Sequence, residues 1–273
     1  MPTVEASDGA KLHYEESGSG TPLLLCNASF ATHAHWSAQL EPLARHFHVI
    51  VWDYRGHGRS EAPADDRRYS LAQVVDDLRV LHREIAGGTP AAVAGLSLGG
   101  LVALSFALAH PERVRALLLL NTGPGFKNPA ARKRWEEGLE RAAARLEEVG
   151  MARYLEGRRA TAELLGRAPD ADAARRAREG MLCSDVAGLA RFARQVAGPV
   201  PNLVDRLAEV RPPCLILVGE HDAAFQRAGE VLEAKLPHAT RRILPGAGHV
   251  LNLDQPEAFV RAVEEFLGAQ GVL

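Results

Sequence analysis

The sequence predicts an α/β protein whose central sheet is open, mostly parallel and covered by helices on both faces. Short aliphatic runs recur along the chain, and each is followed by a longer amphipathic or Ala-rich stretch. Near-continuous apolar runs are typical of parallel strands buried on both faces, and the helical stretches are the crossovers that parallel pairing requires. A length of 273 residues accommodates one such core together with an inserted subdomain.

The strands are expected in the following order. Residues 3–16 alternate around Asp8-Gly9, which predicts a hairpin and therefore an antiparallel start to the sheet. Aliphatic runs mark six further strands, at residues 23–26, 49–53, 91–96, 116–121, 215–219 and 241–244.

The alternation of strand and helix is interrupted once, in residues 124–201, where Arg, Ala and Glu recur at helical spacing. Amphipathic helices are expected at residues 130–149, 151–165 and 171–182. Turn-forming Gly and Pro residues flank the segment at 123–125 and 198–201. We therefore predict a core formed by residues 1–123 and 202–273, with a helical cap, residues 124–201, inserted in it.

The composition is that of an ordinary globular protein, with 47% hydrophobic residues and a net charge of -2. This charge creates no field that attracts nucleic acid or a membrane surface, so a small-molecule substrate is the expected partner, and a homo-oligomer is left open. The three widely spaced cysteines, Cys26, Cys183 and Cys214, are interpreted as free thiols. No signal-peptide pattern or apolar stretch of about 20 residues is present, so we expect a soluble cytoplasmic protein.

The strongest local motif is the sequence GLSLG at residues 95–99, which matches G-x-S-x-G. It follows an apolar strand and precedes a helix-forming stretch, which is the context of a nucleophile elbow. Small residues at positions 95 and 99 allow the strand and the helix to approach closely, and the helix N-terminus faces the reacting group. Ser97 is the predicted nucleophile.

A serine hydroxyl requires a base, and the base requires an orienting acid. Both candidates follow Ser97 in the order that this fold requires. Asp222 lies just past the strand at 215–219, and His249 lies on a Gly-rich loop after the last strand. Glu220 is the alternative acid, but Asp222 is preferred because it lies beyond the strand end.

A tetrahedral intermediate also needs hydrogen-bond donors for its oxyanion. The backbone N–H of Leu98, directly after the nucleophile, is the first predicted donor. The loop after the strand at 23–26 is expected to supply the second, which we assign to the N–H of Ser29.

Four motifs together resemble the α/β-hydrolase superfamily over nearly the whole chain: GLSLGG at residues 95–100, DYRGHGRS at 53–60, GEHD at 219–222 and GAGH at 246–249. The resemblance is strongest to small capped enzymes such as 3-oxoadipate enol-lactonase, carboxylesterases and hydrolases of carbon–carbon bonds. Serine at position 97 separates the chain from haloalkane dehalogenases and epoxide hydrolases, which carry aspartate there. Asn27-Ala28 departs from the His-Gly of most relatives, although enol-lactonases also carry Asn at the first position.

The cap is expected to lie over Ser97 and to form the far wall of a substrate pocket. Apolar surface for this pocket is predicted from Phe30, Trp36, Phe126, Trp135 and Phe192. The cap arginines are interpreted as solvated helix faces, namely Arg153, Arg158, Arg159, Arg191 and Arg194.

These observations predict hydrolysis of a carboxylic ester or lactone through an acyl-enzyme, with no metal or organic cofactor. Carbon–carbon bond hydrolysis of a ring-fission diketone ranks second, and cofactor-free perhydrolysis third. The alternative from a different class is a ligand-binding receptor on the same scaffold, because a fold alone does not settle function.

Overall fold

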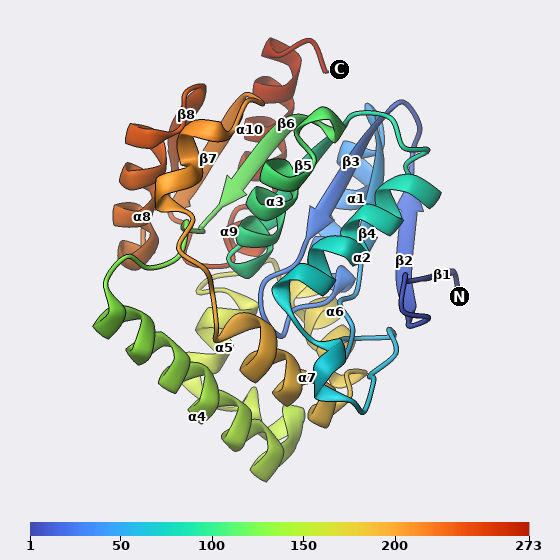
Figure 1. The fold of residues 1–273 in the computed structure, drawn as a ribbon, viewed down its shortest axis with the longest axis vertical. Coiled ribbons are helices and arrows are strands. Elements are labelled where there is room, and N and C mark those ends of the chain that lie inside the picture. The colour runs from blue at the N-terminus through green and yellow to red at the C-terminus, as the bar shows by residue number, and fades with distance from the viewer. Residues whose placement is uncertain (273) are drawn as a thin grey trace.

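A computed structural model of the protein describes residues 1–272, apart from the side chain of Arg159. The described residues form an eight-stranded sheet in the order β1-β2-β4-β3-β5-β6-β7-β8 (Figure 1). The strands are β1 (Thr3–Glu5), β2 (Lys11–Ser17), β3 (Thr21–Cys26), β4 (Phe47–Trp52), β5 (Ala91–Leu96), β6 (Val114–Leu120), β7 (Cys214–Gly219) and β8 (Ala239–Leu244).

The direction of the strands agrees with the sequence-based prediction. β1 and β2 form the expected antiparallel hairpin, and β2 also pairs antiparallel with β4. All other neighbouring strands pair in parallel. The predicted fold class, an α/β protein with a mostly parallel sheet, is confirmed.

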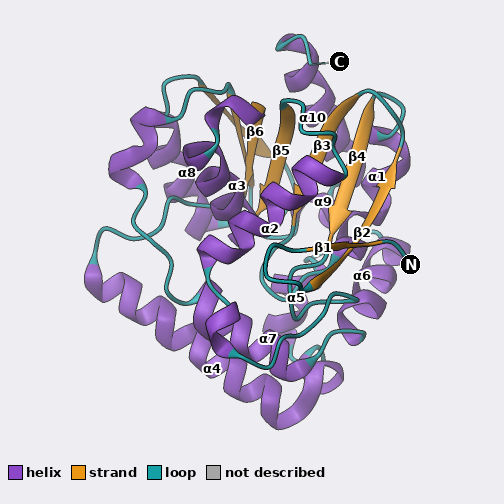
Figure 2. Cartoon of the chain, turned by 45° about the vertical axis from the view of Figure 1, so that its right-hand side comes forward, coloured by secondary structure: helices purple, strands orange, loops and turns teal. Residues whose placement is uncertain are grey.

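Helices cover both faces of the sheet (Figure 2). One face packs against α1 (Ser37–Leu43), α9 (Leu251–Asp254) and α10 (Pro256–Ala269), and the other against α2 (Leu71–Glu84), α3 (Leu98–Ala109) and α8 (Ala223–Lys235). Alternate residues of each central strand enter the two cores: Leu23 and Leu25 of β3 lie in the first, and Leu24 in the second. This double burial explains why the strands are apolar throughout.

Between β6 and β7, the structure has the helices α4 (Pro129–Tyr154), α5 (Arg158–Leu165), α6 (Ala171–Leu182) and α7 (Val186–Phe192), followed by a π-helical turn at Ala193–Ala197. We call α4 to α7 the cap helices. Figure 1 shows the arrowheads of β3 and β6 pointing towards them, so the carboxyl ends of the parallel strands face this part of the chain. Short 3-10 helices complete the structure at His33–Trp36 (η1), Asp66–Arg68 (η2), Pro111–Arg113 (η3) and Val204–Glu209 (η5).

Two details of the cap helices differ from the sequence-based prediction. Two helices were expected to meet at position 150, and the helix is interrupted there by Gly150 (φ 73°, ψ 164°). The helix expected at residues 151–165 is instead divided, because α4 ends at Tyr154 and α5 begins at Arg158. The second difference is α7, which was not predicted. It spans seven residues, too few for a helical period to stand out, and its Leu189 and Phe192 are fully buried.

Candidate active site

Ser97 lies at the turn between β5 and α3 in a conformation that is rare for a residue with a side chain, with φ 56° and ψ -117°. The neighbouring strand holds this turn in place. The backbone N–H of Ser97 donates to the carbonyl of Leu120 (2.9 Å), and the Thr122 hydroxyl donates to the carbonyl of Ser97 (2.6 Å). Hydrogen bonds of this kind from the surrounding structure allow a strained backbone conformation to persist.

The glycines of the motif are required by close backbone approaches. A Cβ atom on Gly95 would overlap with the carbonyl of Gly99, and one on Gly99 would overlap with the carbonyl of Cys26. A third glycine, Gly100, lies against the side chain of Thr122. The strand, the turn and the helix therefore pack together only with glycine at these positions.

Asp222 and His249, which lie 27 residues apart in sequence, are hydrogen bonded. His249 Nδ1 lies 2.6 Å from Asp222 Oδ2, and the His249 ring stacks on Phe225 at 5.1 Å. Asp222 follows β7 and precedes α8, and His249 lies on the loop after β8. A carboxylate that binds Nδ1 leaves Nε2 of the imidazole free to exchange a proton.

Glu220, the alternative acid, has a different partner. Its Oε2 accepts a hydrogen bond from the backbone N–H of Gly246 (2.8 Å), on the loop that leads to His249. The carboxylate therefore ties the end of β7 to this loop.

Asn121 is a residue of the site that the sequence analysis missed. It is fully buried at the end of β6, with φ 40°. Its Nδ2 donates to the carbonyls of Gly248 and His249, and its Oδ1 accepts from the N–H of Gly219, all at 2.8 Å. It fixes the strand that leads to Asp222 and the loop that carries His249. The sequence feature that could have identified it is a polar residue directly after an otherwise aliphatic strand.

Asn27, at the start of the predicted oxyanion loop, is held by its own hydrogen bonds. Its Nδ2 donates to the carbonyl of Trp52 (2.5 Å), and its Oδ1 accepts from Trp36 Nε1 (2.8 Å). The Tyr54 hydroxyl donates to the carbonyl of Asn27 (2.9 Å). Asn27 therefore anchors the loop to the core through three hydrogen bonds.

Beyond Asn27 the loop turns sharply, with Phe30 at φ 63°. Within residues 1–272, the backbone N–H groups of Ser29 and Leu98 donate to no protein acceptor. Ser29 lines the same cavity as Ser97, and Leu98 follows Ser97 directly. Unpaired N–H groups beside a cavity are available to a ligand oxygen.

A cavity of about 940 Å³ connects these groups. Ser97, Asp222 and His249 line it together with the loop residues Ala28, Ser29 and Phe30. Its opposite wall comes from α4 and α5. The size is within the range of small-molecule sites.

The five aromatic residues predicted for the pocket divide into two groups. Phe30 and Trp135 line the cavity. The prediction is wrong for Trp36 and Phe192, which are fully buried in the core, and for Phe126, which packs against Trp135 at 5.9 Å without lining the cavity. Aromatic residues are as easily used for core packing as for a pocket, and sequence spacing does not distinguish the two uses.

The five arginines singled out in the cap region have different surroundings. Arg191 pairs with Asp66, and Arg194 pairs with Glu140 and Glu147. Arg158 is exposed and does not line the cavity, and the side chain of Arg159 lies outside the described residues. Arg153 does line the cavity, as do three arginines that the sequence analysis did not single out, namely Arg134, Arg141 and Arg145.

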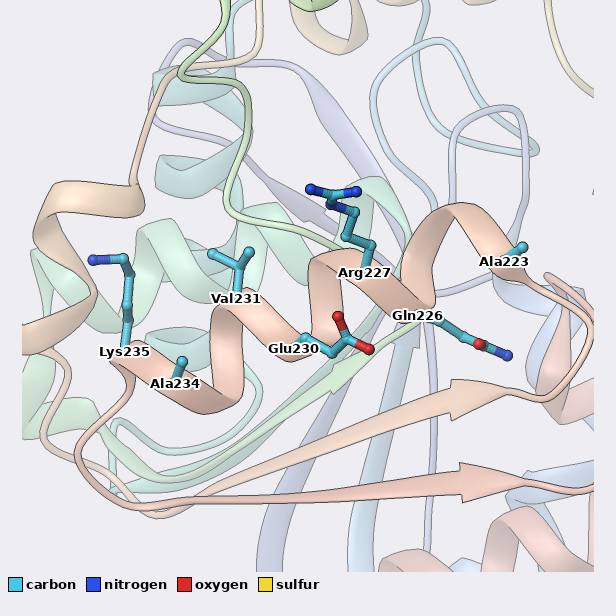
Figure 3. Close-up of a pocket in the computed structure, with 7 residues that line it drawn as sticks. All are labelled: Ala223, Gln226, Arg227, Glu230, Val231, Ala234 and Lys235. Atoms are coloured by element: carbon cyan, nitrogen blue, oxygen red, sulfur yellow. The ribbon is translucent and has the colours of Figure 1, made fainter.

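A second depression, of about 500 Å³, lies along α8 (Figure 3). All its lining residues come from this one helix, from Ala223 to Lys235. It contains none of the three residues Ser97, Asp222 and His249, and we assign it no role.

Comparison with known proteins defines the class. The model of the α/β hydrolase fold family matches residues 21–256. The chain is 29% identical to the 2-(acetamidomethylene)succinate hydrolase of Mesorhizobium japonicum, over 94% of this chain and 92% of that protein. Among known structures, the enol-lactonase of Burkholderia xenovorans LB400 is 25% identical, with a TM-score of 0.82, over 98% of this chain and 100% of that one. A thermophilic esterase of Thermogutta terrifontis is 27% identical, with a TM-score of 0.84, over 99% of both chains.

The chain therefore belongs to the α/β hydrolase fold family, and the three relatives named above are a hydrolase, a lactonase and an esterase. Among the described residues, no helix has both the length and the apolar character needed to cross a membrane.

Proposed function

We propose that the protein is a serine hydrolase that cleaves a carboxylic ester or lactone through an acyl-enzyme. The observation that carries this proposal is the hydrogen bond between His249 Nδ1 and Asp222, on a cavity that Ser97 also lines. The similar structures, which include an enol-lactonase and an esterase, support the same chemistry.

In the proposed mechanism, His249 Nε2 takes the proton of the Ser97 hydroxyl as its oxygen attacks the substrate carbonyl. Asp222 stabilises the imidazolium that forms. His249 then gives the proton to the leaving alcohol, and the acyl group remains on Ser97. In the second half, His249 activates a water molecule, which releases the acid and restores Ser97.

The tetrahedral intermediates carry negative charge on the former carbonyl oxygen. The N–H groups of Leu98 and Ser29, which have no acceptor among the described residues, are the proposed donors to this oxygen. Removal of one such donor in other hydrolases costs about 3 kcal/mol of transition-state stabilisation. The strained turn at Ser97 is the means by which the chain presents both the hydroxyl and the Leu98 N–H to one carbonyl group.

The arginines of the cavity wall support a substrate that carries a carboxylate at some distance from the scissile bond. Among the described residues, Arg134, Arg141 and Arg153 have no ion-pair partner. A carboxylate is the group that guanidinium binds best. Two of the comparisons point the same way, since one relative is named as a hydrolase of a succinate derivative and the esterase structure has malate bound.

The enzyme is tested with an activated aryl ester and a fluorophosphonate probe. Wild type should turn over the ester and take up one equivalent of probe, and Ser97→Ala should do neither. Ser105→Ala is the matched control, because Ser105 lies on α3 with a buried, unpartnered hydroxyl. The proposal fails if Ser97→Ala retains wild-type turnover, or if wild type is inert to both reagents.

The substrate class is tested with a pair of aryl esters that differ only in a terminal carboxylate. Arg153→Gln should raise KM for the carboxylate ester by roughly tenfold, the value of one charged hydrogen bond. It should leave KM for the neutral ester unchanged. Arg158→Gln, on the same cap but outside the cavity wall, is the control. Equal effects of Arg153→Gln on both esters would contradict the carboxylate assignment while leaving the ester chemistry intact.

A further inference from the structure

A second group of titratable side chains lies near the β1 edge of the sheet, on β2 and η1. His13 and Glu15 are two residues apart on β2 and therefore share one face of the strand. His33, at the start of η1, lies against them. Glu15 Oε1 is 3.3 Å from His33 Nε2 and 3.6 Å from His13 Nε2, and the three atoms lie within 4.8 Å of one another.

Both histidines are oriented by partners on their other ring nitrogen. His13 Nδ1 lies 3.0 Å from the carbonyl oxygen of Pro2, which only accepts, so Nδ1 carries a hydrogen. His33 Nδ1 lies 2.9 Å from each carboxylate oxygen of Asp53, a fully buried residue. Both Nε2 atoms are thereby directed to Glu15. This is the arrangement in which metal-binding histidines are held, with the second nitrogen bonded to a carbonyl or a carboxylate.

His13 Nε2 has no hydrogen-bond partner among the described residues, although His13 is only 1% exposed. In the neutral ring this nitrogen presents a lone pair, and the nearest group, the carboxylate of Glu15, also presents lone pairs. An unpaired buried polar atom is costly. A cation between the two would satisfy both.

Two carboxylates flank the two histidine rings. Glu15 lies beside both Nε2 atoms, and the fully buried Asp53 lies beside His33 Nδ1. The cluster therefore favours a positive charge.

We propose that His13 Nε2, His33 Nε2 and Glu15 Oε1 bind a divalent transition-metal ion of the Zn²⁺ class. Tetrahedral Zn²⁺, with bonds of about 2.0–2.1 Å, holds its ligand atoms roughly 3.3 Å apart. The distances to Glu15 are already close to this value. Two imidazoles and one carboxylate select Zn²⁺, Co²⁺, Ni²⁺ or Cu²⁺ over Mg²⁺ and Ca²⁺. A water molecule completes the coordination from the side on which Glu15 is partly exposed.

The metal takes the lone pairs of both Nε2 atoms, so any proton on these atoms is released to solvent when it binds. Arg59 is the group that competes with the metal. Its Nη1 lies 3.3 Å from Glu15 Oε1, and its side chain is 41% exposed, so it is free to move into solvent. The metal would join β2 to the segment that follows the predicted oxyanion loop, and it would thereby stabilise both.

Titration with Co²⁺, whose visible absorption reports coordination by protein ligands, tests the site. Wild type should bind one equivalent, and His13→Gln and Glu15→Gln should each weaken binding at least tenfold. His48→Gln is the matched control, because His48 pairs with Glu16 (2.6 Å) between β4 and β2 without a third ligand. Binding by the control should equal that of wild type.

A variant with increased Co²⁺ affinity distinguishes loss of a ligand from misfolding. Arg59→Gln should bind Co²⁺ more tightly than wild type, because it removes the competing cation, and misfolding does not produce this result. The proposal is overturned if wild type takes up no Co²⁺, if His13→Gln and Glu15→Gln bind it as wild type does, or if His48→Gln loses binding equally.

Discussion

Single residues outside the proposed triad hold the loops of the candidate site in place. Among the described residues, the side chains of Asn121 and Glu220 form no hydrogen bond with Ser97, yet each binds backbone groups of the loop that carries His249. Asn27 does the same for the predicted oxyanion loop. At this scale the site is a set of loops fixed by side-chain to backbone hydrogen bonds, and these bonds determine where the reacting side chains lie.

The choice of acid is a prediction at the residue scale. Asp222→Asn should leave the fold intact and reduce kcat by about 10⁴, as the equivalent change does in a serine protease, because His249 would lose its orienting carboxylate. Steady-state kinetics with an aryl ester measure this. Glu220→Gln is the control and should have a much smaller effect, since its contact is with the Gly246 N–H. If Glu220→Gln is the crippling change, the assignment of Asp222 is wrong.

Acid sensitivity is a second prediction at this scale. His35 accepts from the Thr32 N–H through Nδ1 and lies 3.1 Å from the Leu164 carbonyl through Nε2, so it is neutral when folded. Burial lowers its pKa from 6.5 to about 4. The unfolded chain therefore binds a proton that the folded protein does not, and stability is lost as pH falls from about 6.5 towards 4.

For one such histidine, the loss between pH 7 and pH 5 is about 2 kcal/mol. Urea unfolding at the two pH values measures it. His35→Gln should reduce the difference, and His238→Gln, a change at an exposed histidine, is the control. An undiminished pH difference in His35→Gln would contradict the prediction.

At the scale of elements, α4 shows how one residue sets the shape of a helix. Gly150 has φ 73° and ψ 164°, which interrupts α4 before its last turn. Gly138, in the same helix, has ordinary helical geometry, and a Cβ atom there would meet only Arg141 at 3.9 Å. The same substitution should therefore have opposite effects at the two positions.

Gly150→Ala should destabilise the protein by about 1–3 kcal/mol, because the backbone there is essentially restricted to glycine. Gly138→Ala should stabilise it by up to about 1 kcal/mol through helix propensity. Thermal unfolding followed by circular dichroism compares the two variants with wild type. Changes of the same sign would show that the break at Gly150 is not maintained in solution.

At the scale of the whole molecule, Arg55 connects three separate parts of the chain. It is fully buried and donates two hydrogen bonds to Asp77 on α2, at 2.8 and 2.7 Å. It also donates to Asp8 in the turn between β1 and β2 (2.9 Å). The motif DYRGHGRS, through Arg55, is thus a structural junction.

Asp77→Asn should lower the free energy of unfolding by about 3–5 kcal/mol, because the buried guanidinium of Arg55 would lose a negatively charged partner. Asp76→Asn is the matched control on the same helix. Asp76 pairs with Arg79 near the surface, where a salt bridge contributes about 1 kcal/mol or less. Urea unfolding of the two variants measures the difference, and equal losses would contradict this role for Arg55.

The sequence predicted the strands well because their apolar pattern is local. Each aliphatic run became a strand within a few residues of its expected ends, and Gly95 and Gly99 marked the elbow because backbone contacts there exclude side chains. The pocket was predicted less well. Trp36 and Phe192 are core residues, and three of the four cavity arginines were not foreseen.

The sequence by itself determined the order and type of the strands, the position of Ser97 and the identity of the two residues, Asp222 and His249, that could partner it. These features are encoded by residue type and spacing along the chain. Only the tertiary structure decided which carboxylate meets His249, which side chains face the cavity, and that His13, Glu15 and His33 converge. The physical reason is that such contacts join residues far apart in sequence, and their geometry depends on how the whole core packs.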